Sequence, residues 1–534
     1  MTLLHDALMM PGAILGGHIA AADIGLGNWF ARRTLQTPDR QALTFEGVTR
    51  SYAQMQDAID RLAAALKAAG LCRGDRVGFL GLNQPLYFDL LFAAARLGAI
   101  FVPLNFRLTG PELDYIINDA GIHTLVVDGP HRPIIDGIRE RLCCQLYLSA
   151  DGAAPDWQPV SKFVQPAAPL TGAEPTADED IAVIMYTSGT TGRPKGVMLT
   201  HGNLWWANIN SMLATDFSET DIAIVMAPLF HIGGLNTGAL ATWQNGGHII
   251  LHRSFDPERF VADVAHYRVT ATFAVPAMLL FISQLPGFES ADLSSLRLIA
   301  CGGAPAPEPL LRLYNARGIP LNQGYGLTET APSGTWMGND FALAKLGSAG
   351  RAAFFVDLRI VGPDGRTPLG PGERGEIVMR GPQIMRGYWN KPEATAEAID
   401  PEGWFHSGDI GYLDDDGFLF ICDRLKDMII SGGENIYPAE VETVLYGHDA
   451  IGEVAVFGEP SEKWGESVTA VAVLKPGASL DLEELRSWAT ERLARYKLPT
   501  RLEIIDALPR NPAGKVLKFE LRDRFVVLPE DQAQ

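Results

Sequence analysis

The first half of the chain alternates short apolar strands with helices. Residues 76–82 (RVGFLGL) have the length and apolarity of a buried strand, and residues 85–97 (PLYFDLLFAAARL) predict a helix that buries most of its surface. Residues 98–104 then predict a second strand, and the alternation resumes over residues 222–300. A helical crossover between two strands is typical of parallel pairing. We therefore expect an α/β fold whose large N-terminal domain is built of βαβ layers.

The chain is too long for one ordinary hydrophobic core, because it has 534 residues. After about Gly347, short strands separated by turns such as residues 362–365 (GPDG) and 414–417 (DDDG) predict a β-rich subdomain. Pro438, followed by apolar residues at helical spacing, predicts a helix in a smaller α+β domain at the C-terminus. We expect an N-terminal domain of residues 1–425, including the β-rich subdomain, and a C-terminal domain of residues 426–534.

The composition argues against several classes of protein. The net charge is −19, from 44 basic and 63 acidic residues, and no basic run is present, so we expect no nucleic acid partner. The five cysteines follow no metal-binding spacing, which favours reduced thiols and a cytoplasmic location. No apolar stretch is as long as a membrane span, and the N-terminal residues lack the charged start of a signal peptide.

A loop rich in glycine and hydroxyl groups follows the predicted strand of residues 181–186. Residues 187–196 (TSGTTGRPKG) combine three glycines, four hydroxyls and one lysine. Glycines let backbone N–H groups approach a phosphate, and a lysine adds charge. The sequence is not a Walker A loop, because Arg193 and Pro194 separate Gly192 from Lys195. A glycine-rich surface turn is the alternative, and we interpret the loop as a polyphosphate-binding segment.

Five segments, in order along most of the chain, resemble the signature motifs of the adenylate-forming superfamily. That superfamily includes acyl-CoA synthetases, firefly luciferase and the adenylation domains of peptide synthetases. The segments are residues 187–196, 323–330 (QGYGLTET), 404–409 (WFHSGD), 423–427 (DRLKD) and 509–515 (PRNPAGK). Residues 301–305 (CGGAP), 423–442 and 462–466 (EKWGE) are most similar to bacterial long-chain and very-long-chain fatty acid:CoA ligases.

The resemblance implies a two-step reaction that uses ATP, Mg²⁺ and coenzyme A. A carboxylate attacks the α-phosphorus of ATP to form an acyl-adenylate, and a thiol then displaces AMP. The implied catalytic residues are Lys515, Thr187, Glu329 and His231, with Glu329 as the metal ligand. The resemblance also implies a mobile C-terminal domain with its hinge at Lys426. The implied nucleotide and coenzyme A contacts are Thr187, Ser188, Gly189, Thr190, Thr191, Gly192, Lys195, Gly303, Ala304, Pro305, Gln323, Gly324, Tyr325, Gly326, Thr328, Asp409, Arg424, Lys426, Ser431, Gly432 and Gly433.

Most of these residue types also have an ordinary structural interpretation. A histidine between apolar neighbours, such as His231, is more often a core residue than a gate. Gly233 and Gly234 beside it are expected to leave an open channel for a long acyl group, with residues 275–277 and 302–304 as pocket walls. The glycine pair at 432–433 fits an ordinary tight turn as well as a passage for a pantetheine arm.

The identity of the acid is the main question that the sequence leaves open. Medium- to long-chain fatty acids are the first expectation, and aryl, arylpropenoic and alicyclic acids are alternatives. The thiol acceptor is expected to be coenzyme A, with the pantetheine of a carrier protein as the alternative. A catalytically inactive nucleotide-binding protein is disfavoured because the matching catalytic positions are filled. The sequence does not distinguish a monomer from a homodimer, and it leaves peripheral membrane contact open.

Overall fold

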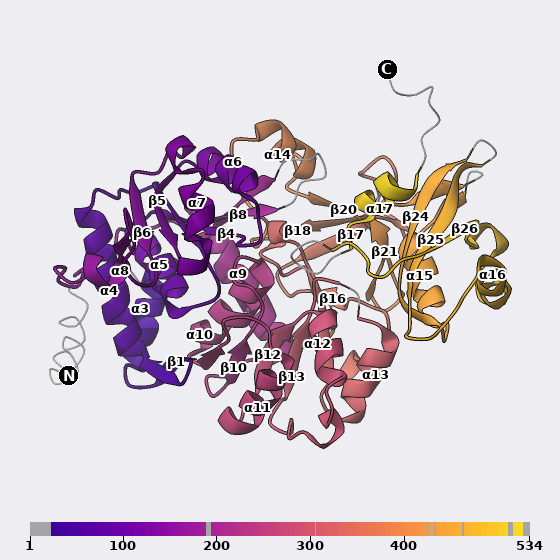
Figure 1. Ribbon diagram of the computed structural model, residues 1–534, viewed down its shortest axis with the longest axis horizontal. Coiled ribbons are helices and arrows are strands. Elements are labelled where there is room, and N and C mark those ends of the chain that lie inside the picture. Colours follow the sequence, from indigo (N-terminus) through magenta and orange to yellow (C-terminus); the bar gives the residue numbers. More distant parts are fainter. Residues whose placement is uncertain are drawn as a thin grey trace, which may run out of the picture. The chain divides into compact units, whose positions relative to one another are not determined.

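The computed structural model describes residues 23–187, 194–304, 306–424, 427–431, 434–461, 464–510 and 516–526, without the side chains of residues 423, 424, 434 and 435. The chain divides into two compact units (Figure 1). Unit 1 comprises the chain up to Leu358 together with Met379–Phe405. Unit 2 comprises Arg359–Val378 together with the chain from His406 onward.

Unit 1 contains two large sheets, here called sheet A and sheet B. The strand order of sheet A is β16-β15-β14-β13-β12-β10-β11-β1-β2, and that of sheet B is β19-β9-β8-β4-β3-β5-β6-β7. The strands of sheet A are β1 (Gln41–Phe45), β2 (Val48–Ser51), β10 (Ile222–Val225), β11 (His248–Leu251), β12 (Ala271–Ala274), β13 (Leu298–Cys301), β14 (Leu321–Tyr325), β15 (Thr335–Trp336) and β16 (Arg351–Ala352). The strands of sheet B are β3 (Arg76–Leu80), β4 (Ile100–Leu104), β5 (Ile122–Val127), β6 (Leu146–Ser149), β7 (Gln158–Pro159), β8 (Ile181–Thr187), β9 (Lys195–Thr200) and β19 (Gly387–Tyr388).

Helices connect these strands and cover the sheets. In sequence order they are α3 (Leu26–Gln36), α4 (Tyr52–Ala68), α5 (Pro85–Arg96), α6 (Gly110–Ala120), α7 (Arg132–Asp136), α8 (Val160–Phe163), α9 (His201–Thr215), the π-helix η3 (Gly233–Leu240), α10 (Ala241–Asn245), α11 (Pro257–Tyr267), α12 (Pro276–Ser283), α13 (Glu308–Ala316) and α14 (Pro392–Ala398). Helix α5 begins with a proline at its first turn and is buried along most of its length, as its apolar sequence predicts. Helix α4 begins at a capping box, in which Ser51 and Gln54 satisfy each other's backbone N–H groups.

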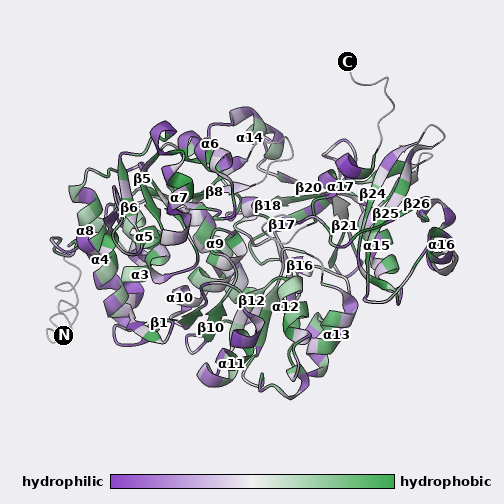
Figure 2. Ribbon diagram, in the orientation of Figure 1, coloured by the Kyte–Doolittle hydropathy of each residue, from purple (hydrophilic) through white to green (hydrophobic). Residues whose placement is uncertain are grey.

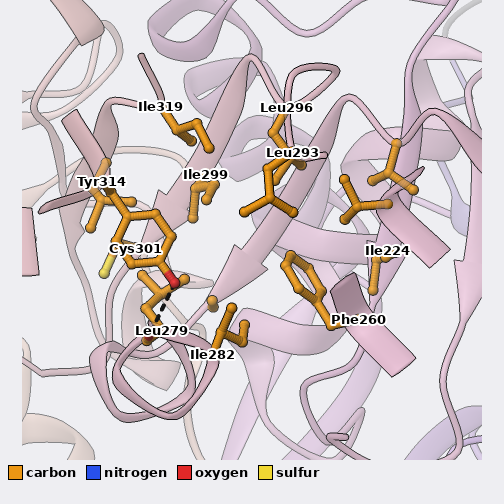
Figure 3. Packing of buried hydrophobic residues seen from close by; sticks show 14 of the residues in the cluster. Ile224, Phe260, Leu279, Ile282, Leu293, Leu296, Ile299, Cys301, Tyr314 and Ile319 are labelled. Atoms are coloured by element: carbon orange, nitrogen blue, oxygen red, sulfur yellow. Dashed lines mark hydrogen bonds between the residues drawn. The ribbon is translucent and has the colours of Figure 1, made fainter. Parts of the chain in front are cut away.

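Helices α11, α12 and α13 pack on sheet A through one continuous hydrophobic core (Figure 3). Phe260, Leu279 and Tyr314 are fully or nearly fully buried there against Ile224 and Ile299 of the strands. Each such side chain contributes about 1.5–3 kcal/mol by leaving water. In Figure 2 the strands of this sheet are mostly hydrophobic, whereas helices α11 and α13 carry both hydrophobic and hydrophilic residues.

Unit 2 is built from smaller sheets and short helices. One sheet has the order β17-β18-β20-β21, and the other has β23-β22-β25-β24 with β26 beside β25. The helices of this unit are α15 (Pro438–Tyr446), α16 (Leu482–Thr490) and α17 (Lys518–Phe525). The strands are β17 (Asp357–Val361), β18 (Gly375–Arg380), β20 (Phe405–Leu413), β21 (Leu419–Arg424), β22 (Ile429–Ser431), β23 (Glu434–Ile436), β24 (Ile451–Ser461), β25 (Gly465–Leu474) and β26 (Arg501–Ile504).

The mixed α/β class predicted from the sequence is confirmed. The predicted strand–helix–strand unit of residues 76–104 is β3-α5-β4, and β3 and β4 pair in parallel. The helix predicted after Pro438 is α15, with Val441 and Leu445 buried on its apolar face. Among the described residues, no helix is both long enough and apolar enough to cross a bilayer.

Candidate active site

Several predicted site segments emerge from the same edge of sheet A. Strands β10, β12, β13 and β14 are consecutive parallel neighbours in that sheet. The carboxyl ends of parallel strands lie at one edge, where ligands bind in open α/β sheets. The segments that follow the first three of these strands contain His231, Val275 and Gly302–Ala304, and Tyr325 is the last residue of β14. The topology therefore gathers residues that are almost a hundred positions apart.

Phe273 lies at the centre of this edge. A Cβ atom on Gly233 would lie 2.6 Å from Cζ of Phe273, and a Cβ atom on Gly302 would lie 3.7 Å from Cε2 of the same ring. The Cβ atom on Gly302 would also lie 3.1 Å from the carbonyl oxygen of Gly324. Phe273 as a whole residue is half-buried. The aromatic ring of Phe273 thus packs beside both Gly233 and Gly302, and we call this ring the aromatic wall.

This packing corrects the expected role of Gly233 and Gly234. From their small size we expected both glycines to leave an open channel. Instead, the ring of Phe273 occupies the side-chain position of Gly233, and the carbonyl oxygen of Pro228 lies 2.6 Å from a Cβ atom on Gly234. Glycine is needed at both positions because neighbouring atoms come close, not because the space beside it is empty.

His231 lies just before the π-helix and is uncharged at neutral pH. Burial lowers its pKa to about 4, and the nearby positive charge of Arg107 adds to the shift. Within the described residues, its Nε2 atom is buried without a hydrogen-bond partner. A neutral imidazole cannot neutralise phosphate charge, although it can line a pocket or make one hydrogen bond. The gating role of His231 stays a prediction.

The hairpin of β8 and β9 holds the two ends of the phosphate loop. Thr187 and Lys195 are direct partners across this antiparallel pair. Gly196 must be glycine, since a Cβ atom there would lie 2.8 Å from Ile184 and 3.0 Å from Tyr186. The loop therefore joins two strands of sheet B, unlike the strand–loop–helix of a Walker A motif. Ser188, Gly189, Thr190, Thr191 and Gly192 lie outside the described residues.

Glu329 is connected to this hairpin through Tyr388. Glu329 lies in the short 3₁₀-helix η5 (Thr328–Thr330), and its Oε1 atom accepts a 2.9 Å hydrogen bond from the Tyr388 hydroxyl. Tyr388 belongs to β19, which pairs with β9. The Nζ atom of Lys195 lies 5.0 Å from the centre of the Tyr388 ring. The structure thus brings two predicted site residues, Lys195 and Glu329, to one tyrosine.

The segment that contains Tyr325 is held by close backbone packing. Gln323 supports two loops, because its Oε1 atom accepts from the N–H of Ala306 and its Nε2 atom donates to the carbonyl of Ser348. A Cβ atom on Gly326 would lie 1.6 Å from the carbonyl oxygen of Pro332, so only glycine fits there. Tyr325 itself is half-buried at the end of β14. The nucleotide contacts predicted for this segment stay predictions.

The segment that follows β13 contains three more predicted nucleotide contacts. Gly303 has a φ of +83°, a conformation that favours glycine, and both Gly303 and Ala304 are exposed. Pro305 lies outside the described residues. The exposed backbone of Gly303 and Ala304 is therefore accessible to a ligand at this edge.

The remaining predicted residues belong to unit 2. Asp409 is buried in β20, pairs in register with Arg424 of β21, and donates its N–H to Oγ of Ser407 at 3.1 Å. Ser431 pairs with Glu434 across the β22–β23 hairpin. The residues outside the described part are Lys426, Gly432, Gly433 and Lys515, together with the side chain of Arg424.

Sequence reasoning missed Tyr388 and Phe273. A tyrosine after Gly387 and a phenylalanine in a strand carry no signal of chemistry, because both types usually pack in cores. Each acquires its position through a partner more than twenty residues away. Sequence spacing alone could not have identified either residue.

Comparisons with known proteins define the class of this chain. A family model described as AMP-binding enzyme matches residues 30–389, and one described as AMP-binding enzyme C-terminal domain matches residues 440–515. The chain therefore belongs to the AMP-binding enzyme family, and within it to the AMP-forming acid:CoA ligases of the adenylate-forming superfamily. This confirms the resemblance found in the sequence.

Individual relatives act on different acids, as their names state. A feruloyl-CoA synthase from Amycolatopsis is 46% identical over 94% of this chain and 99% of its own. A long-chain-fatty-acid–CoA ligase from Mycobacterium tuberculosis is 40% identical over 90% of this chain and 93% of its own. The solved structure of o-succinylbenzoate coenzyme A synthetase from Bacillus subtilis, in complex with ATP and magnesium ion, has a TM-score of 0.83 and is 34% identical over 93% of this chain and 99% of its own.

The described residues fit the ATP and magnesium that this class uses. Mg²⁺ is usually bound by one or two protein carboxylates together with substrate phosphates. Glu329 provides a carboxylate whose Oε1 atom accepts a hydrogen bond from Tyr388, and an ionised carboxylate offers about four lone-pair positions in all. Lys195, at the end of the phosphate loop, contacts the same tyrosine. The donor set thus suits a divalent cation that is bound together with a polyphosphate.

Proposed function

We propose that this enzyme is an AMP-forming ligase that joins an arylpropenoic acid to coenzyme A. The observation that carries the proposal is the half-buried Phe273, whose ring lies against Gly233 and Gly302 at the edge of sheet A where the parallel strands end. Aromatic rings gain about 0.5–1.5 kcal/mol by pairing with another ring, in addition to the gain from burial. The higher identity to a feruloyl-CoA synthase, 46% against 40% for the long-chain ligase, supports the same class of acid.

The chemistry proceeds in two displacements at carboxyl and phosphoryl centres. In the first, a carboxylate oxygen bonds to the α-phosphorus of ATP while the bond to pyrophosphate breaks. In the second, the thiol sulfur of coenzyme A bonds to the acyl carbon, AMP leaves and the thiol proton is released. Both reactants of the first step are anions, so positive charge near the phosphates lowers the barrier.

The residues of the chain divide this work. Thr187 and Lys195, with the loop between them, bind the polyphosphate, and Glu329 binds the cation. Mg²⁺, when bound, neutralises the phosphate charge. Asp409 and Arg424 bind the ribose, and Lys515 contacts the carboxylate and the α-phosphate. Ser431, Gly432 and Gly433 serve the pantetheine arm in the second step, for which the C-terminal domain of residues 426–534 rotates at Lys426.

A panel of acids tests the identity of the substrate. Ferulate, cinnamate, benzoate, octanoate, dodecanoate and palmitate are each supplied with ATP and coenzyme A, and AMP release is measured. We expect kcat/KM for ferulate or cinnamate to exceed that for dodecanoate by about 10-fold or more, the scale on which pocket shape discriminates. A higher kcat/KM for dodecanoate or palmitate would reject the arylpropenoic proposal in favour of a fatty acid.

The Phe273→Leu variant tests the role of the aromatic wall. Leucine fills similar space without a ring, so the ratio of kcat/KM for ferulate to that for dodecanoate should fall by about 2–10-fold. Phe288→Leu is the matched control, because Phe288 packs in the core against Tyr314. An equal ratio of kcat/KM values in the wild type and in Phe273→Leu would show that Phe273 does not contact the acyl group.

A medium- to long-chain fatty acid is the second candidate. It is favoured by the 40% identity to the long-chain ligase and by the similarity of residues 301–305 and 423–442 to such ligases.

Holo-carrier protein offered in place of coenzyme A tests the alternative thiol acceptor. A cytoplasmic location and a homodimer stay predictions.

A further inference from the structure

Tyr388 is attached to the carboxylate that the proposed function assigns to the metal. Its hydroxyl donates to Oε1 of Glu329 at 2.9 Å. The backbone of the same short segment also contacts Glu329, because the N–H of Met385 donates to the carbonyl oxygen of Glu329 at 2.8 Å. Glu329 is therefore held at its backbone and at its side chain by residues only three positions apart.

The backbone around Tyr388 is itself fixed on both sides. The N–H of Tyr388 donates to Oγ1 of Thr395 at 2.9 Å. The N–H of Trp389 donates to the carbonyl of Gly196 in β9 at 2.7 Å, and its indole N–H donates to the carbonyl of Asp119 at 3.0 Å. Tyr388 therefore couples the position of the Glu329 carboxylate to the strand that begins at Lys195.

A tyrosine hydroxyl suits this task better than a cation. A lysine or arginine paired with Glu329 would neutralise its charge and compete with a bound metal ion. A neutral hydroxyl donates one hydrogen bond and leaves the carboxylate negative. Groups that hydrogen-bond to metal ligands in this way typically change metal affinity by about 10–100-fold when they are removed.

We propose that Tyr388 is a positioning residue that orients Glu329 toward the divalent cation bound with ATP. The inference rests on the proposed function, because it assumes that Glu329 binds that cation. Tyr388 acts through the carboxylate of Glu329. Its hydroxyl is the group that holds this carboxylate, while its ring lies beside Lys195.

The Tyr388→Phe variant tests the inference, because it removes only the hydroxyl. Binding of Mn²⁺ to the full chain in the presence of ATP, without acid, is measured from the electron paramagnetic resonance signal of free Mn²⁺, and the signal lost to ATP alone is subtracted. We expect the dissociation constant for Mn²⁺ to rise by about 10-fold. At saturating Mg²⁺, acid-dependent pyrophosphate exchange should return to within about 3-fold of the wild-type rate, as expected when only metal binding is weakened.

A double-mutant cycle separates positioning from general damage. If Tyr388 acts through Glu329, the double variant Tyr388→Phe/Glu329→Gln should bind Mn²⁺ no more weakly than Glu329→Gln alone. Tyr314→Phe is the matched control, since it loses the buried 2.8 Å hydrogen bond to the carbonyl of Leu279 (Figure 3) and should leave the Mn²⁺ dissociation constant unchanged. Additive effects in the cycle would overturn the inference.

Other outcomes distinguish the inference from the function on which it rests. If the wild type neither binds Mn²⁺ with ATP nor catalyses acid-dependent pyrophosphate exchange, the proposed function fails. If the wild type does both and Tyr388→Phe has the wild-type dissociation constant, only the positioning role fails. Should Tyr388→Phe not fold, Thr395→Val removes the acceptor of the Tyr388 N–H, and an unchanged dissociation constant there would reject the role.

Discussion

His231 shows how burial changes the chemistry of a single residue. Its sequence neighbours, Phe230 and Ile232, allow either a core histidine or a gate. The structure makes the imidazole neutral, with its pKa lowered to about 4 by burial and by the charge of Arg107. His231 therefore cannot supply the positive charge that the adenylation step needs, and we assign this task to Lys195 and Lys515 as part of the proposed function.

Changing Lys515 to alanine should separate the two half-reactions. The loss of one positioned charge donor should slow adenylation by about 10²–10³-fold or more. Thioester formation from supplied acyl-adenylate should continue, because in that step the thiol attacks the acyl carbon and AMP leaves, so no bond to phosphorus forms or breaks. The two rates are measured by pyrophosphate exchange and by acyl-CoA formation. An equal fall in both rates, in a folded variant, would contradict the assignment.

At the scale of elements, close packing between short strands supports the site. Strand β15 pairs with β14 on one side and with β16 on the other, and β14 ends at Tyr325. Gly350, directly before β16, has a φ of +94°, and a Cβ atom there would lie 2.1 Å from the backbone carbonyl carbon of Trp336. The close approach of β15 and β16 therefore depends on Gly350, which the sequence does not distinguish from other glycines nearby.

Gly350→Ala should destabilise unit 1 much more than Gly347→Ala. Both glycines have a positive φ, which costs an alanine about 1–2 kcal/mol. Only at Gly350 does the added methyl group meet backbone atoms, since nothing lies within 4 Å of a Cβ atom on Gly347. Overpacking adds about 1–3 kcal/mol. Urea unfolding measures the difference, and similar midpoints for the two variants would show that β15 and β16 can separate without cost.

At the scale of the molecule, buried histidines couple stability to pH. Burial lowers the pKa of His201, His231 and His248 to about 4 from an ordinary value of 6.5. The unfolded chain therefore binds more protons than the folded chain between about pH 4 and 6.5. The free energy of unfolding contributed by these groups must fall as the pH falls through that range.

His248→Gln should weaken this dependence. Between pH 7 and pH 5, a histidine whose pKa falls from 6.5 to about 4 on folding contributes a loss of about 2 kcal/mol. The wild type should therefore lose about 2 kcal/mol more than the variant over this interval in urea unfolding experiments. Buried acids such as Asp60 and Asp89, whose pKa values are raised chiefly by burial, are present in both proteins. Their contributions to the pH dependence of stability therefore cancel in the comparison. Equal losses in the two proteins would show that folding does not lower the pKa of His248.

The sequence by itself was sufficient for the fold class and for the family of the enzyme. Apolar periodicity identified β3, α5, β4 and α15, because burial follows a local repeat. The glycine, hydroxyl and lysine groups of residues 187–196 predict a polyphosphate-binding loop, and this role stays a prediction.

Only the tertiary structure decided which distant residues meet. The Tyr388 hydroxyl reaches Glu329 from 59 positions away, and Phe273 fills the side-chain space of Gly233 from 40 positions away, so neither pairing leaves a local pattern. The charge of His231 was likewise decided by surroundings that its neighbours in sequence do not reveal. The physical reason is that a residue's type is local information, whereas its contacts, burial and pKa depend on atoms that only chain folding brings near.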